Sequence, residues 1–177
     1  MVRLRTNRSR RNNITYVIFV SLIASALIII ATNLWFPVLR VVGSSMQNTL
    51  QSDDVVVCCN VYGDIDRGEI IAFYNNDRIL LKRVVGLPGD TIILDTDGTV
   101  FINGERQAET YVMTLSHEPC DIEFPVEVPN DAYFVLGDRR TTSMDSRSDK
   151  IGMVTEDKII GKMLFRIWPF NSLGPVD

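Results

Sequence analysis

One stretch of the chain carries no charged residue and is long enough to cross a membrane. It covers residues 12–39, and its most apolar part, ITYVIFVSLIASALIIIATNLWF, covers residues 14–36. At a rise of about 1.5 Å per residue, a helix over residues 14–36 spans a hydrocarbon core of about 30 Å. Tyr16 lies near one end and Trp35 near the other, where aromatic rings favour the membrane interface. We therefore expect one transmembrane helix over residues 14–36.

The flanks of this run predict its orientation. Residues 1–13 hold five arginines and no acidic residue, and such basic flanks stay in the cytoplasm by the positive-inside rule. The net charge of the whole chain is −4, so the residues beyond the basic tip carry −9. We expect a single-pass protein of the cell membrane with residues 1–13 cytoplasmic and residues 37–177 outside. The acidic body disfavours nucleic acid as a partner, whereas membrane lipid is the expected partner of the helix.

A cleaved leader is the alternative to a retained anchor. Residues 24–26 read ASA, which fits the small-residue pattern of a leader cleavage site. However, the aliphatic residues 27–30 follow directly, so this pattern lies inside the apolar run rather than at its polar end. The placement favours a retained anchor.

The outer part of the chain is predicted to be mainly β. Short runs of β-branched and aromatic residues alternate with turn residues, and no stretch beyond residue 40 shows helical periodicity. The predicted strands lie within residues 53–59, 68–75, 78–86, 91–104 (a hairpin), 132–138 and 158–169 (a strand pair or one bent strand). Residues 105–128 are expected to form an excursion from this β core. Cys58, Cys59 and Cys120 show no C-x-x-C spacing, which favours free or buried thiols over a disulfide and disfavours a zinc site.

The sequence GSSM at residues 43–46 suggests a serine nucleophile. On an extended backbone Ser44 and Ser45 would point to opposite sides, so only one of them could face a base. A serine hydroxyl needs such a base to remove its proton. His117 is the only histidine, but no acidic residue at a recognisable spacing would orient it.

Lys82 is the other candidate base. It lies in ILLKRVVG, where strand alternation puts Leu80 and Val84 on its own face and Arg83 on the other. Burial among aliphatic groups would lower the pKa of Lys82 enough for base catalysis. The same position also suits a lysine that extends from a sheet edge to water, so the residues alone leave both interpretations open.

Four motifs occur in an order that resembles a known family. They are GSSM after the anchor, LLKRVVGLPGD, YFVLGDRRTTSMDSR and IIGKMLFRIWPF. Together they resemble the bacterial type I signal peptidases, the Ser–Lys leader peptidases, in their short Gram-positive form. The resemblance implies a signal-peptidase-like antiparallel β-sheet catalytic domain preceded by one transmembrane helix. It also implies a serine endopeptidase that removes signal peptides from exported preproteins and needs no metal or cofactor.

The resemblance implies roles for individual residues. Ser45, directly before the methionine, is the implied nucleophile, its backbone N–H the implied oxyanion donor, and Lys82 the implied general base. The position two before the nucleophile adds a hydroxyl donor in some members, but here it is Gly43. The implied supporting residues are Gly137 and Asp138 in a turn, Ser143, whose hydroxyl would orient the lysine, and Asp145 with Arg147, which would brace the site.

Two residues depart from the family pattern. Asn48 stands where proline is usual, which would loosen a turn near the nucleophile. Arg139 stands where asparagine is usual, and its charge would help to keep Lys82 neutral if it pointed inward.

The expected substrate is an extended peptide that adds to a sheet edge. Small residues at the positions one and three before the cut would fill shallow apolar pockets. Val41 and Leu81 are candidate walls of these pockets because they lie near Ser45 and Lys82 in the sequence.

Two alternatives to this enzyme remain. The first is a catalytically weak or inactive peptidase-like membrane protein that binds or assembles surface proteins, which the intact Ser45 and Lys82 disfavour. The second is another Ser–Lys enzyme, such as a self-cleaving repressor, which would carry a DNA-binding module in place of the anchor.

Overall fold

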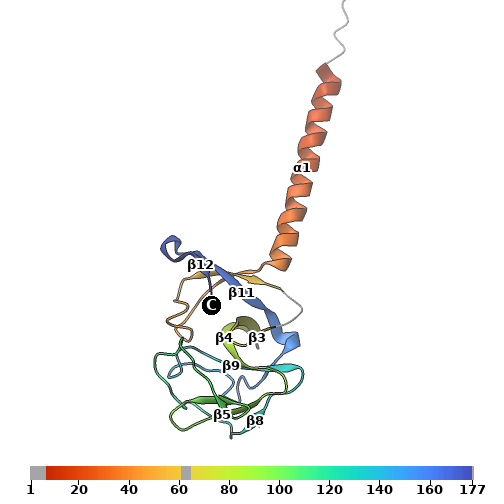
Figure 1. Ribbon diagram of the computed structural model, residues 1–177. Coiled ribbons are helices and arrows are strands. Elements are labelled where there is room, and N and C mark those ends of the chain that lie inside the picture. Colours follow the sequence, from red (N-terminus) through yellow and green to blue (C-terminus); the bar gives the residue numbers. More distant parts are fainter. Residues whose placement is uncertain (1–6, 61–64, 177) are drawn as a thin grey trace, which may run out of the picture.

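A computed structural model describes residues 7–60 and 65–176. A long helix, α1 (Asn7–Trp35), projects away from a β body (Figure 1). Its segment Asn13–Thr32 is long and apolar enough to cross a membrane, and none of it is buried against the body. The predicted helix is therefore confirmed. It begins earlier than expected, at Asn7, because the arginine-rich residues that follow contain no glycine or proline and arginine is a good helix former.

The β body contains two antiparallel sheets within the described residues. The larger sheet has the spatial order β1 (Val38–Arg40), β2 (Val55–Cys59), β11 (Ile159–Trp168), β3 (Ile70–Asn75), β4 (Arg78–Gly86), β9 (Ala132–Leu136) and β10 (Val154–Thr155), and β12 (Gly174–Pro175) pairs with β11. The smaller sheet has the order β7 (Glu105–Arg106), β6 (Val100–Ile102), β5 (Thr91–Leu94) and β8 (Val126–Glu127). The described helical residues beyond α1 form two 3₁₀ turns, η1 (Glu156–Lys158) and η2 (Phe170–Ser172).

The strands predicted within residues 53–59, 68–75, 78–86, 91–104 and 132–138 are confirmed. Residues 158–169 form the single strand β11, whose pairing with β2 and β3 shifts in register, so the bent strand is the correct alternative. The short strands β1, β7, β8, β10 and β12 were not predicted. They are two or three residues long, which is too short for a period-two pattern to be recognised.

Two of the three apolar clusters of the described residues hold the sheets and one turn in place. In one of them, side chains of β4 and β9 pack against side chains of β5 and β6, which joins the two sheets. In the other, Met46 and Leu50 are buried together with Val56 of β2 and Ile70 of β3. The turn that contains Met46 and Leu50 is thereby held against the larger sheet.

Residues 105–128 leave the smaller sheet through β7 and return through β8, as expected of an excursion. Its middle is nevertheless tied to the rest of the body. Glu109 forms a buried ion pair with Arg140, with the two side chains 5% and 0% exposed. The ring of Tyr111 lies 4.1 Å from the guanidinium carbon of Arg83 on β4. The excursion therefore packs against β4 and against the segment that follows β9.

Candidate active site

Ser45 lies in a hydrogen-bonded turn rather than in a strand. The N–H of Gln47 donates to the carbonyl of Ser44 (3.1 Å), and the N–H of Leu50 donates to the carbonyl of Met46 (2.8 Å). The expectation of an extended backbone at the two serines is therefore wrong, because the chain turns there to bury Met46 and Leu50. Ser44 is exposed and Ser45 is half-buried, so they still differ in environment.

Asn48 is part of the same turn and has a φ of 98°. Asparagine tolerates this left-handed region better than most residues, whereas the proline ring fixes φ near −65°. A proline could therefore not replace Asn48 in this conformation. The turn is closed by backbone hydrogen bonds instead, so the departure from the family pattern does not leave it open.

Lys82 comes from β4, where it lies opposite Ile71 of β3. Its side chain is buried, at 3% exposure, and its Nζ lies 2.7 Å from Ser45 Oγ. The alternative of a lysine that extends to water is therefore wrong. Burial lowers the pKa of Lys82 to about 8, against opposing effects of the Asp145 and Asp138 charges, while Arg147 lowers it further.

This geometry suits proton transfer from a hydroxyl to an amine. A protonated Lys82 donates a hydrogen bond to Ser45 Oγ, whereas a neutral Lys82 can accept the hydroxyl proton. With a pKa of about 8, roughly a tenth of the molecules hold Lys82 neutral at pH 7, compared with fewer than about one in a thousand for an ordinary lysine. The pair can therefore supply a nucleophile and its base near neutral pH.

An apolar groove passes beside the two side chains. Its cavity volume is about 190 Å³. Ser45 and Lys82 line it together with the predicted wall residues Val41 and Leu81 and with Ile79. The structure thus brings all four predicted residues to one groove, and their contact with substrate stays a prediction.

Arg83 joins β4 to the turn of residues 44–50, which we call the nucleophile turn after the role predicted for Ser45. It is buried on the opposite side of the strand from Lys82, and its guanidinium donates two hydrogen bonds to Asp138, at 2.9 and 2.8 Å. The same guanidinium donates to Thr49 Oγ1 at 3.1 Å, and Thr49 in turn donates to Asp138. The predicted turn residue Asp138 therefore clamps the end of the nucleophile turn to the strand that carries the base.

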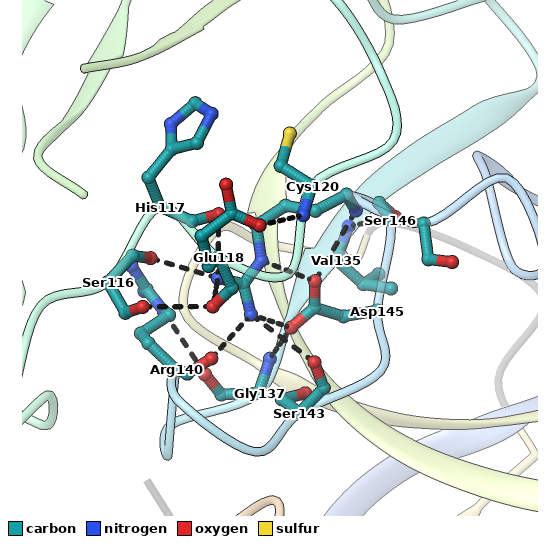
Figure 2. Close-up of polar contacts among 12 residues, drawn as sticks. Ser116, His117, Glu118, Cys120, Val135, Gly137, Arg140, Ser143, Asp145 and Ser146 are labelled. Atoms are coloured by element: carbon teal, nitrogen blue, oxygen red, sulfur yellow. Dashed lines mark hydrogen bonds and ion pairs between the residues drawn. The ribbon is translucent and has the colours of Figure 1, made fainter. Parts of the chain in front are cut away.

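Asp145 and Arg147 form a buried ion pair, which we call the brace. The role that the resemblance implies for this pair stays a prediction. Arg147 Nε and Nη2 donate to the two carboxylate oxygens of Asp145 at 2.8 and 2.9 Å, and neither side chain is exposed. Arg147 also donates to the carbonyls of Ser116 (2.9 Å) and Arg140 (2.8 Å). Figure 2 shows these carbonyl groups and the carboxylate of Asp145 converging on one guanidinium. The brace thus links the excursion to the site.

Gly137 is confined between the brace and the nucleophile. Its N–H donates to Asp145 Oδ2 at 3.0 Å. A Cβ at this position would lie 2.7 Å from the carbonyl oxygen of Ser45 and 2.5 Å from Cβ of Ser143. Only glycine therefore fits between these residues.

Ser143 is buried, but it does not bond to Lys82. Within the part of the chain that the structure describes, its Oγ has no hydrogen-bond partner. The implied role of this hydroxyl in orienting the lysine stays a prediction. Gly43 has no side chain, so the second oxyanion donor cannot be a side chain at that position.

His117 and Arg139 lie away from the base. His117 Nδ1 lies 3.1 Å from the carbonyl oxygen of Asp95, and its ring meets Phe124 edge-on. Arg139 is exposed and donates to Gln47 Oε1. Its charge therefore points outward, and it does not contribute to the lowered pKa of Lys82.

Several residues of the site were not predicted from the sequence. They are Thr49, Arg83, Glu109, Tyr111 and Arg140. Arg83 carried a local signal, because it adjoins Lys82 in the KRVVGLPGD motif. Glu109 and Tyr111, the partners of Arg140 and Arg83 on the excursion, carried no signal. Nothing in a single sequence pairs residues that lie as far apart as Glu109 and Arg140, which are 31 positions apart.

The chain is similar to several known proteins. The family model described as signal peptidase, peptidase S26, matches residues 13–168. Signal peptidase I S of Bacillus subtilis is 33% identical over 178 residues, covering 94% of this chain and 96% of that protein. Signal peptidase IB of Staphylococcus aureus is 35% identical over 150 residues, covering 73% of this chain and 76% of that protein. The crystal structure of a signal peptidase I from Enterococcus faecalis has a TM-score of 0.47 and 32% identity, covering 56% of this chain and 97% of that chain.

Proposed function

The chain belongs to the signal peptidase family, peptidase S26, and is a membrane-anchored serine endopeptidase that removes signal peptides; we propose that Ser45 is its nucleophile and Lys82 its general base. The observation that carries this assignment is the 2.7 Å distance between Lys82 Nζ and Ser45 Oγ. The alternative of a non-cutting relative has no support in the comparisons, and an intact pair at this distance is what catalysis needs.

The reaction proceeds in two steps. Neutral Lys82 accepts the proton of Ser45 Oγ as the oxygen attacks the scissile carbonyl carbon, and the protonated lysine then gives this proton to the leaving amine. The new carboxyl terminus of the signal peptide remains on Ser45 as an ester. Lys82 next removes a proton from water as the water oxygen attacks the ester carbonyl carbon. The protonated lysine then gives this proton to Ser45 Oγ as the ester bond breaks, which releases the signal peptide and restores the free serine and neutral lysine.

The negative oxygen of each tetrahedral intermediate needs hydrogen-bond donors. The backbone N–H of Ser45 suits this role because, among the described residues, it donates to no other acceptor. The surrounding turn is held by Met46 and Leu50 in the core and by the contact of Thr49 with Asp138. This packing keeps the donor in place without reorganisation during the reaction.

The substrate binds in the groove between residues 39–43 and residues 79–82. Residues 78–82 of β4 pair only with β3 among the described strands, because the pairing with β9 begins at Arg83. An extended peptide can therefore add to this edge through main-chain hydrogen bonds. The groove beside Val41 and Leu81 leaves room for small residues one and three positions before the cut. The preproteins that the enzyme cleaves carry small residues at these two positions.

The division of the chain follows from the same proposal. Residues 1–13 form the cytoplasmic tip, residues 14–36 cross the membrane, and residues 37–177 form the catalytic domain outside the cytoplasm. The five arginines of the tip support this orientation. Protease added outside intact cells should digest the β domain, and protection of that domain would contradict the orientation.

The assignment of the dyad is tested by single-turnover cleavage of a leader peptide with alanine at both recognition positions. Ser45→Ala and Lys82→Ala should each lower the rate by about three orders of magnitude or more, as the loss of one member of a catalytic unit does. Ser44→Ala and His117→Ala are the matched controls and should cost little. A Ser45→Ala chain with full activity, or a dead His117→Ala chain, would refute the Ser–Lys mechanism.

A further inference from the structure

A second hollow adjoins the far end of the nucleophile turn. Its cavity volume is about 400 Å³. Gln47 and Asn48 of the turn line it, together with Arg139 and Thr141 from the segment after β9 and Met113 from the excursion. Ser45 and Met46 line the apolar groove instead, so the groove and the hollow meet the same turn at its two ends.

The two cavities differ in the part of a substrate that they can accept. A peptide that is cut at Ser45 must leave the nucleophile in two directions. The half before the cut ends in small apolar residues, which suit the groove lined by Val41, Ile79 and Leu81. The half after the cut, which becomes the start of the mature protein and is called the mature segment, therefore passes Gln47 and Asn48 toward the polar hollow. At about 3.3 Å per extended residue, the first few residues of the mature segment lie within reach of it.

Arg139 gives this hollow a positive charge. Its backbone N–H donates to the carbonyl of Ser45 at 3.0 Å, which places the residue directly beside the nucleophile. Its side chain is exposed and is held at the turn by Gln47 Oε1. Arg139 forms no ion pair with any residue of the described ranges 7–60 and 65–176. Asp138 also lines the hollow, but its carboxylate is buried and neutralised by Arg83.

We propose that Arg139 is a specificity-determining residue that binds an acidic side chain within the first three residues of the mature segment. This inference rests on the proposed function, because it needs the cut to occur at Ser45. A guanidinium carries five N–H donors in a planar fork, so one bond to Gln47 leaves donors for a carboxylate. The asparagine that is usual at this position in the family carries no charge and could not make this distinction.

The expected preference is modest, because the contact is exposed to solvent. An exposed ion pair changes an equilibrium or rate by about fivefold at most. The test uses the full chain in detergent micelles and peptides that share one leader half. Each peptide carries Asp, Asn or Lys at the first, second or third position after the cut, and kcat/KM is measured for each. At one or more of these positions, kcat/KM should be about fivefold higher for the Asp peptide than for the Lys peptide. This ratio should fall at high salt, which screens an exposed ion pair.

Variants assign this preference to Arg139. Arg139→Gln should bring the Asp-to-Lys ratio close to one, and Arg139→Glu should invert it. Lys158→Glu, an exposed charge reversal in η1 that lines neither cavity, should leave the ratio unchanged.

Three results would contradict the proposal. Equal cleavage of the Asp and Lys peptides by the unaltered chain would overturn it, and so would an Asp preference that survives Arg139→Gln. In both cases the proposed function would stand, because the peptides are still cut. Cleavage of none of the peptides would refute the proposed function and this inference with it.

Discussion

Lys82→Met should make the protein more stable at neutral pH while abolishing its activity. Methionine has nearly the length of lysine but no charge to bury, and the lysine side chain is 3% exposed. In the unaltered chain, folding must take a protonated ammonium group out of water at every pH below about 8. The methionine variant removes that cost.

The size of the effect follows from the pKa of Lys82. Burial lowers this pKa from 10.5 to about 8, and each pKa unit corresponds to 1.36 kcal/mol. The unfolded chain binds the proton more tightly, so the stability of the unaltered chain rises with pH between about 8 and 10.5. The charge penalty is therefore about 3 kcal/mol at pH 7 and falls to about 1 kcal/mol at pH 10. The advantage of the variant should shrink by about 2 kcal/mol over this range.

The measurement is guanidinium unfolding of the full chain in detergent, followed by tryptophan fluorescence at pH 7 and pH 10. Lys162→Met is the matched control. The pKa of Lys162 is raised, chiefly by its hydrogen bond to Glu69, so its ion pair stabilises the fold below the unfolded pKa and this contribution is lost as pH rises further. Lys162→Met should therefore give no gain at pH 7. If Lys82→Met were no more stable than the unaltered chain at pH 7, or if its advantage did not depend on pH, the lowered pKa would be wrong.

The remaining predictions concern the base, the confined glycine and the excursion. Because Lys82 must be neutral, kcat/KM should rise about tenfold per pH unit and level off near pH 8; a rise that continued to pH 10 would contradict the assignment. Gly137→Ala should cost about 1–3 kcal/mol and most of the activity, because its methyl group would meet the carbonyl of the nucleophile at 2.7 Å. Gly174→Ala, where a Cβ meets nothing within 4 Å, should cost little in the same unfolding assay. Glu109→Gln should destabilise the fold by about 3 kcal/mol, because it leaves the buried charge of Arg140 without its partner; an unchanged unfolding midpoint would show that the excursion is not anchored there.

The parts of the fold that were predicted are those that local patterns encode. The uncharged run of residues 12–39 indicated the helix, and runs of β-branched and aromatic residues between turn residues indicated the longer strands. The alternation argument also placed Lys82 and Arg83 on opposite faces of β4, which the structure confirms. It failed at Ser44 and Ser45, because the burial of nearby apolar side chains made the chain turn.

For the candidate site, the sequence predicted only residues that lie in or beside a motif of the family. Ser45 and Lys82 are 37 residues apart, and no periodicity joins them; the resemblance to a family did. In the contacts of Arg83 with Thr49 and of Arg140 with Glu109, only the arginine lies in a quoted motif. Thr49 and Glu109 lie in irregular segments. Such pairs depend on how loops from distant parts of the chain pack, which the order of residues alone does not reveal.

The short connection between α1 and β1 sets a length scale for the substrate. The helix ends at Trp35 and β1 begins at Val38, and the groove is already lined from Leu39 onward. Four residues of extended chain span at most about 14 Å, so the groove begins within that distance of the end of α1. A preprotein whose own apolar segment is held in the bilayer must reach the same groove. Under the proposed topology, about four extended residues therefore suffice to bring the part of a preprotein that leaves the bilayer to the start of the groove.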